Sequence, residues 1–220
     1  MNERILVFAP HNDDEVLGVG GTLAKYAATG AEITICEITA RDNPEGVKRI
    51  QTEARNAHAV LGASKSIFLN LPVVNLTSLP QMELTKHFCE VVREVNPTIA
   101  FIPHIGDMHT DHRATADTAM VALRPYEAPA LHTIYAYETL SETEWNIPSV
   151  TNAFLPDTWI DISDMLETKL KAMSCYQTQL HPFPHPRSLE AIRALAQYRG
   201  STVNCMAAEA FKTVRRIVRG

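Results

Sequence analysis

Short apolar segments alternate with longer amphipathic segments through roughly the first 140 residues of the chain. Apolar or β-branched runs of strand length lie at residues 5–9, 31–38, 66–69, 98–102 and 131–137. Helical patterns lie between them, at residues 18–29, 45–61, 82–95 and 113–123. This alternation predicts an α/β fold, namely a Rossmann-like, doubly wound and mostly parallel sheet in a three-layer arrangement.

The last third of the chain is less regular. Residues 164–176, 188–198 and 207–218 have helical character, whereas residues 180–187 carry three prolines and two histidines and predict a loop. No repeat, low-complexity tract or change of composition separates this part from the rest. We therefore predict a single domain over residues 1–220, in which residues 1–140 form the Rossmann-like core and residues 141–220 complete a pocket.

A dense polar motif follows the first predicted strand directly. Residues 10–15 read Pro-His-Asn-Asp-Asp-Glu, which places one imidazole and three carboxylates within five residues. A helix cap would explain one of these residues, but three neighbouring carboxylates repel one another unless protons or a cation compensate. A bound metal ion is the natural compensation.

A second polar motif follows the strand predicted at residues 98–102. Residues 104–112 hold three histidines and two aspartates, and ligands of parallel α/β sheets collect at such strand ends. A lone histidine is ordinarily a surface or satisfied core residue, but this cluster supplies the ligand types that catalytic zinc uses. Together the motifs fit a zinc site with two histidines and one aspartate. Other divalent transition metals, such as iron, cobalt, nickel or manganese, suit the same ligands.

The two motifs resemble the signatures of the PIG-L (LmbE-like) family of zinc-dependent N-deacetylases. The first matches the N-terminal signature except that Asn12 stands where the family has proline, and residues 109–112, His-Thr-Asp-His, match the second. The helix that contains Arg49 and Glu53 also resembles the family, although the spacing between the arginine and the glutamate is one residue longer than usual. Residues 198–200 and 208–211 extend the resemblance over nearly the whole chain.

The resemblance implies that His11, Asp14 and His112 bind zinc and that Asp13 is the general base. Zinc lowers the pKa of a bound water to about 7, and a carboxylate within hydrogen-bond reach can take the proton and deliver it to the departing amine. The expected reaction is removal of an acetyl group from an N-acetylated amino sugar of the GlcNAc type, or from its conjugate.

Three further residues receive roles by the same resemblance. His109 is the candidate donor to the oxyanion, as a protonated imidazole that Asp111 would support. Arg49 is the candidate substrate-binding residue, through a sugar hydroxyl or carboxylate. Besides the metal ligands, no residue is expected to bind a cofactor.

Composition and charge narrow the choice of partners. The formal net charge of −5 argues against nucleic acid, and no apolar stretch is long enough for a membrane span or a signal-peptide core. We expect a cytoplasmic protein that acts on a small molecule, and the resemblance favours a homo-oligomer.

Three other interpretations remain open. A hydrolase of esters or non-sugar amides would use the same site, and a metal carrier without catalysis would not need Asp13. Gly18-Val19-Gly20-Gly21 superficially matches a dinucleotide-binding fingerprint, but Leu23 stands in place of its final glycine and the preceding carboxylates would repel a pyrophosphate. These glycines more simply let the helix pack close to the sheet.

Overall fold

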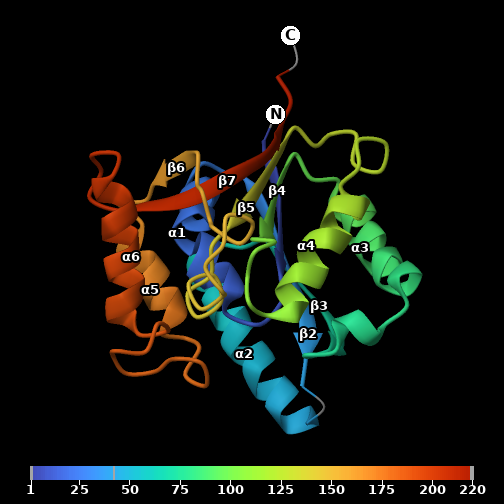
Figure 1. The fold of residues 1–220 in the computed structure, drawn as a ribbon, viewed down its shortest axis with the longest axis horizontal. Coiled ribbons are helices and arrows are strands. Elements are labelled where there is room, and N and C mark those ends of the chain that lie inside the picture. Colours follow the sequence, from blue (N-terminus) through green and yellow to red (C-terminus); the bar gives the residue numbers. More distant parts are fainter. Residues whose placement is uncertain (1, 42, 219–220) are drawn as a thin grey trace.

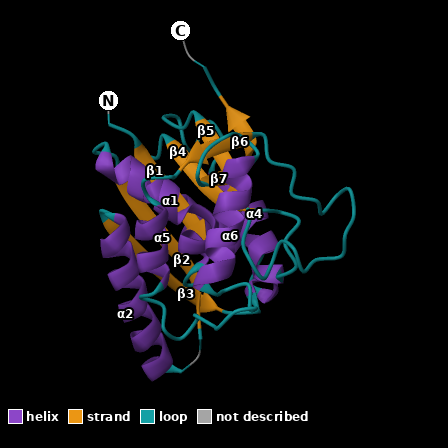
Figure 2. Ribbon diagram, turned by 90° about the vertical axis from the view of Figure 1, so that its left-hand side faces the viewer, coloured by secondary structure: helices purple, strands orange, loops and turns teal. Residues whose placement is uncertain are grey.

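The computed structural model describes residues 2–41 and 43–218. Across these residues the chain forms a seven-stranded sheet with helices on both faces (Figures 1 and 2), which confirms the predicted three-layer, single-domain α/β fold. In chain order the elements are β1 (Arg4–Ala9), α1 (Asp14–Ala28), β2 (Glu32–Ala40), α2 (Pro44–Leu61), β3 (Lys65–Pro72), the short 3₁₀ helix η1 (Leu76–Ser78), α3 (Gln81–Val95), β4 (Ile99–Pro103), α4 (Thr110–Ala122), β5 (Thr133–Tyr137), β6 (Thr158–Asp161), α5 (Leu166–Met173), α6 (Leu189–Ser201) and β7 (Ala208–Arg216).

The sheet has the order β3-β2-β1-β4-β5-β7-β6. Strand β1 pairs in parallel with β2 on one side and with β4 on the other, so the direction of chain progression reverses between β1 and β4. At such a switch point the loops after the two strands diverge to opposite faces and leave a crevice at the carboxyl ends. Both polar motifs follow these two strands.

Two apolar cores lie on opposite faces of the sheet. Helices α1, α2, α5 and α6 cover one face and α3 and α4 the other, as Figure 1 shows to the left and right of the strands. Alternate side chains of β1 enter different cores, with Ile5 and Val7 on the α1 side and Leu6 and Phe8 on the α3 side. A strand that is buried on both faces in this way is apolar throughout, which explains the continuous run in the sequence.

Helix α1 lies very close to its neighbours. A Cβ atom on Gly18 would lie 2.2 Å from the ring of Tyr137, and one on Gly21 would lie 2.6 Å from Ile162. This contact confirms that the glycines permit close packing.

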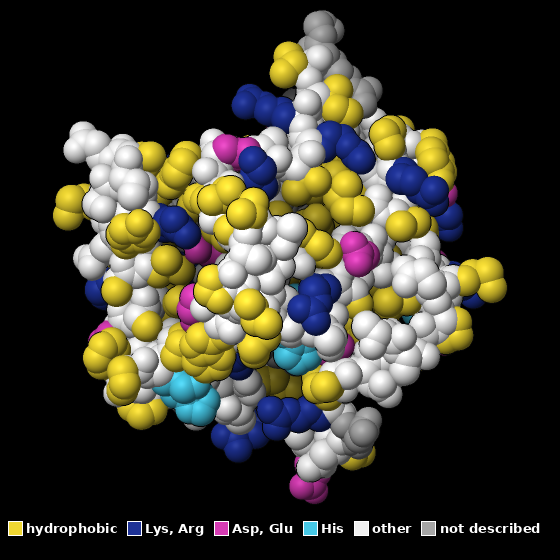
Figure 3. Space-filling model, viewed as in Figure 1, with side chains coloured by type: hydrophobic (Ala, Val, Ile, Leu, Met, Phe, Trp, Pro, Cys, Tyr) yellow, Lys and Arg dark blue, Asp and Glu magenta, His cyan; other side chains and the backbone are white. Residues whose placement is uncertain are grey.

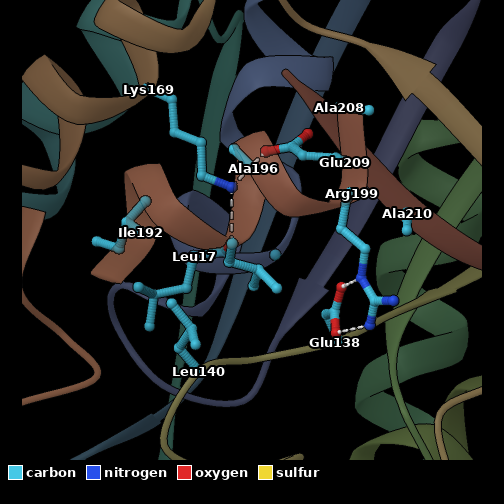
Figure 4. A pocket seen from close by; sticks show the side chains of 12 residues that line it. Leu17, Glu138, Leu140, Lys169, Ile192, Ala196, Arg199, Ala208, Glu209 and Ala210 are labelled. Carbon is cyan, nitrogen blue, oxygen red and sulfur yellow. Dashed lines mark hydrogen bonds and ion pairs between the residues drawn. The ribbon is translucent and has the colours of Figure 1, made fainter. Parts of the chain in front are cut away.

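A buried ion pair anchors the C-terminal third to α1 (Figure 4). The Lys169 ammonium lies 2.6 Å from a Glu209 carboxylate oxygen and also donates to the carbonyl of Leu17 at 2.8 Å. Glu209 in turn accepts the backbone N–H groups of Gly21 and Thr22, at 2.9 and 2.7 Å. The space around the pair is nearly filled, with a cavity of about 10 Å³. Strand β7 and helix α5 are thereby fixed to the helix that carries the first motif.

The helix predicted over residues 207–218 is wrong, because residues 208–216 form strand β7. This strand is antiparallel to both β5 and β6, and β6 itself was not predicted. The segment is rich in alanine, glutamate, lysine and arginine, which favour helices, but the hydrogen-bonding edge of β5 overrides that preference. Each of the other predicted strands and helices corresponds to an observed element, and α1 begins earlier than predicted, at Asp14.

No helix in the described part of the chain is both long and apolar enough to cross a bilayer.

Candidate metal centre and active site

The two polar motifs meet at the carboxyl ends of β1 and β4. His11 lies in the turn after β1, Asp14 opens α1, and His112 lies in the first turn of α4. The Nδ1 atom of His11 lies 3.3 Å from Asp14 Oδ2 and 3.3 Å from His112 Nε2, and the last two atoms are 3.2 Å apart. One ligand atom from each residue therefore converges on a common point, where a metal ion can be held.

The second nitrogen of each imidazole is held by a buried carboxylate. His112 Nδ1 lies 2.8 Å from Asp107, which also accepts a hydrogen bond from the Thr143 hydroxyl at 2.6 Å. His11 Nε2 lies 3.2 Å from Asp111. Carboxylates of this kind fix the tautomer and orientation of metal-binding histidines and increase their basicity.

A further observation indicates that this group of side chains fits a metal ion. Asp14 is fully buried, yet its Oδ1 atom has no hydrogen-bond partner. A second trio, His11, His109 and Asp111, is also close enough to hold an ion. There, however, Asp111 already accepts the backbone N–H groups of the segment after β3. The donor set of His11, Asp14 and His112 is the better fit, because its aspartate retains a free buried oxygen.

Asp13 lies beside this donor set without belonging to it. Its carboxylate is fully buried, and one oxygen lies 3.3 Å from the guanidinium of Arg187. Burial raises the pKa of Asp13 to about 8; the charge of Arg187 opposes the rise, and the neighbouring Asp14 and Glu15 add to it. A cation held beside Asp13 would lower this value and so bring the exchange of a proton by the carboxylate nearer to neutral pH.

Arg187 is a residue of the site that the sequence did not reveal. It ends the proline-rich loop of residues 180–187, and its guanidinium is also 3.5 Å from Glu142 and bonded to Ser141 and Gln179. The loop composition indicated a connection between elements, and no motif distinguished this arginine from an ordinary surface cation.

His109 differs from expectation in its protonation. Its Nδ1 accepts the backbone N–H of Asp111 at 3.1 Å, whereas the Asp111 carboxylate lies 3.9 Å away and closer to His11. Burial and the neighbouring His11 lower the pKa of His109 to about 4. The ring is therefore neutral at pH 7, with its proton on Nε2, and Asp111 orients His11 rather than supporting a charged His109.

An open cavity of about 490 Å³ lies over these residues. Its lining includes His11, Asn12, Arg49, His109, Glu142 and Arg187. Figure 3 shows this face hollowed below its centre, where histidine side chains lie among those of lysine and arginine. Arg49 is at the rim, with its side chain 65% exposed and paired with Glu53, so the structure does not bring it to the metal ligands.

Comparison with known proteins places the chain in a family. A family model described as "PIG-L: GlcNAc-PI de-N-acetylase" matches residues 6–123, a span that includes both polar motifs. The chain belongs to the PIG-L family. The diacetylchitobiose deacetylase of Thermococcus kodakarensis is 25% identical over 191 residues, which cover 80% of this chain and 70% of that protein.

Solved structures share the fold across the whole chain. The conserved protein TT1542 from Thermus thermophilus superposes with a TM-score of 0.79 at 27% identity, covering 99% of this chain and 97% of its own. The 4-carboxy-2-hydroxymuconate hydratase GalB from Pseudomonas putida superposes with a TM-score of 0.78 at 19% identity, covering 100% and 99%. The latter likeness concerns the fold alone. The relatives by sequence are deacetylases, which supports an amide hydrolase.

Proposed function

We propose that this protein is a zinc-dependent N-deacetylase, which removes the acetyl group from an N-acetylated amino sugar of the GlcNAc type or from its conjugate. The observation that carries the proposal is the convergence of His11, Asp14 and His112 beside an open cavity that His11 lines, with Asp13 next to them but outside the donor set. A fold does not fix a reaction, so the proposal rests on this arrangement of side chains.

The proposed roles follow from the geometry. His11, Asp14 and His112 would hold zinc, which when bound polarises the acetyl carbonyl and makes water a nucleophile at neutral pH. Asp13 takes the proton of the attacking water and passes it to the nitrogen of the departing amine. Arg187 orients the Asp13 carboxylate, and the Nε2–H group of His109 donates a hydrogen bond to the oxygen that becomes negative.

The sugar would lie in the open cavity. Its walls combine polar side chains from both parts of the chain, including Arg49 of α2 and Gln179 before the proline-rich loop. Hydroxyl groups of a sugar suit such a lining, and we propose that Arg49 contacts the substrate at the rim and that residues 141–220 complete the pocket. A cytoplasmic location and a homo-oligomer stay predictions.

Acetate release tests the proposal. N-Acetylglucosamine, diacetylchitobiose and a GlcNAc glycoside would each be incubated with metal-stripped protein, with zinc-restored protein and with the zinc-restored Asp13→Asn variant. We expect release only from the zinc-restored wild type, with a loss of more than about 1000-fold in the variant because the proton acceptor is gone. Asp117→Asn on the exposed face of α4 is the matched control and should keep full activity.

Two results would contradict the proposal in different ways. Zinc-dependent release that Asp13→Asn leaves intact would remove Asp13 from its role as base. Absence of release from every sugar by metal-loaded protein would reject the substrate class, and esters and non-sugar amides would then be tested with the same variants.

A further inference from the structure

Four buried side chains from separate segments meet beside the first motif. They are Glu15 of α1, Glu37 of β2, His58 of α2 and Tyr176, which lies just after α5. His58 Nε2 lies 3.3 Å from Glu15 Oε1 and 3.1 Å from Glu37 Oε1. The Tyr176 hydroxyl donates to the same two carboxylates, at 2.6 and 3.2 Å. The Nδ1 atom of His58 is held by Ser66 of β3 at 2.7 Å.

This cluster reaches Asp13 through the backbone. The N–H group of Asp13 donates to Glu15 Oε2 at 3.2 Å. Asp13 has φ 108° and ψ −24°, a left-handed conformation that residues with a side chain rarely adopt and that the surroundings must enforce. An aspartate that opens a helix ordinarily turns its carboxylate onto the helix N–H groups, but the side chain of Asp13 makes no such bond.

We propose that Glu15, Glu37, His58 and Tyr176 are positioning residues, which hold the backbone of Asp13 in its left-handed conformation and so direct its carboxylate into the site. This inference rests on the proposed role of Asp13 as the general base. The four side chains are buried and are joined to Asp13 through its N–H bond to Glu15, so they act through Asp13 and not on the substrate.

Charge complementarity supports the network. Burial alone would lower the pKa of His58, but hydrogen bonds and charges from Glu15 and Glu37 raise this pKa to about 9. An imidazolium between two buried carboxylates offsets much of their desolvation cost and locks all three groups in place. Both Glu15 oxygens are then occupied, one by Tyr176 and His58 and the other by the N–H of Asp13.

A second metal site is the rival explanation. Atoms of Glu15, Glu37 and His58 lie within the distance that an ion would bridge, and Glu37 Oε2 has no hydrogen-bond partner. Tyr176 already donates to both carboxylates, and the second Glu15 oxygen accepts the N–H of Asp13, so these groups have partners within the protein. The two explanations predict different metal contents, which can be measured directly.

The test uses Tyr176→Phe and His58→Gln in the zinc-loaded enzyme. Phenylalanine keeps the ring and removes the donor, and glutamine keeps a donor and removes the charge. We expect kcat to fall about 10- to 100-fold because the base is misdirected, with KM within about twofold and metal content unchanged. Tyr26→Phe, at the far end of α1, is the control for the first variant.

His132→Gln is the matched control for the second variant. The His132 ring also bridges a hydroxyl, that of Thr133, and a carboxylate, that of Glu3, but it lies at the opposite ends of the strands. It should keep the wild-type kcat. In an Asp13→Asn background, Tyr176→Phe should cause no further loss of the residual rate, because positioning matters only while the base is present.

Hydrogen exchange gives a readout that needs no substrate. The segment around Asp13, residues 10–17, should exchange its amide protons faster in both variants than in their controls, because the Asp13 N–H loses its fixed acceptor. If the wild type deacetylates no sugar, the proposed function fails, and this exchange still decides whether the network holds Asp13.

Specific outcomes would overturn the inference. Unchanged kcat and unchanged exchange in Tyr176→Phe would show that Asp13 needs no such support, even if His58→Gln fails to fold. A lower melting temperature with unchanged kcat would show a structural role only. Two metal ions per chain, one of them lost in His58→Gln, would establish the rival metal site.

Discussion

His109 serves two purposes with its two ring nitrogens. Nδ1 accepts a backbone N–H at the start of α4, and Nε2 carries the N–H group that would donate a hydrogen bond to the proposed oxyanion. Because the two nitrogens are distinct, a substitution can separate the helix cap from the catalytic donor.

His109→Asn keeps a capping oxygen but has no donor in the place of Nε2, whereas His109→Ala removes both. We expect kcat to fall about 100- to 1000-fold in both variants, as for the loss of one oxyanion donor. The melting temperature should fall only in His109→Ala. Acetate release and thermal unfolding measure the two effects, and a kcat within about threefold of wild type in His109→Asn would exclude the ring as donor.

The sequence predicted the site residues that belong to dense local motifs. His11, Asp13 and Asp14 lie together, and His109 and Asp111 lie together, so their chemistry was visible without a fold. Arg187 was not predicted, because it reaches Asp13 across 174 positions from a loop that carries no motif. The protonation of His109 was also missed, since it depends on burial and on the neighbouring rings.

At the scale of elements, α1 connects the site to the C-terminal third. Asp13 and Asp14 open the helix, and its middle is bonded to the Lys169–Glu209 pair. Breaking a buried ion pair by removing one partner leaves the other charge buried and uncompensated.

Lys169→Met should therefore lower the free energy of unfolding by about 3 to 5 kcal/mol. Adding Glu209→Gln should recover part of the loss, because the neutral amide no longer carries the uncompensated charge. Urea unfolding measures both variants against Lys171→Met, an exposed lysine on the same helix that should have little effect. A Lys169→Met protein as stable as Lys171→Met would show that the pair contributes nothing.

A strand or helix could be predicted where its own residues carry the hydrophobic pattern of that element. The strands from β1 to β5 are apolar runs between helices, and their periodicity identified them. Strand β7 was not identified from the sequence. Its partners are β5, which ends some 70 positions earlier in the chain, and β6, which was not predicted. Its own residues favour a helix, and pairing with β5 and β6 along its length makes them a strand.

At the scale of the whole molecule, the sheet brings the ligand residues together, and the C-terminal third supplies further contacts to their neighbours. The switch point between β1 and β4 brings two motifs, separated by about 100 residues in the chain, into one metal-binding group. Arg187 and Tyr176, both from the C-terminal third, then contact Asp13 and Glu15. The fold thus combines a local ligand set with long-range contacts to its proposed base.

The buried network also gives the whole molecule a pH-dependent stability. His58 faces Glu15 of α1, Glu37 of β2, and Ser66 and Phe68 of β3. Hydrogen bonds to the two carboxylates overcome burial and raise the pKa of His58 from 6.5 to about 9, and burial raises the pKa of Glu37 from 4.5 to about 7. Both groups hold a proton in the folded state at pH values where the unfolded chain has released it.

Stability should therefore fall as the pH rises. The contribution of His58 is complete below pH 6.5 and is lost as the pH passes through about 9, and that of Glu37 is complete below pH 4.5 and is lost through about 7. Urea unfolding at about pH 6, 8 and 10 would compare the zinc-saturated wild type with the double variant His58→Gln and Glu37→Gln. The double variant should show a smaller decline, because it lacks both titrating groups.

The wild type and the variants are compared at the same metal content. The metal ligands then change protonation equally in all of them, so a difference in the pH dependence of stability comes from His58 and Glu37. His132→Gln should keep the wild-type slope, since His132 lies outside the network. Parallel curves for the wild type and the double variant would mean that His58 and Glu37 release their protons at the same pH in the folded and unfolded states. His58 would then not be a charged member of the network that holds Asp13.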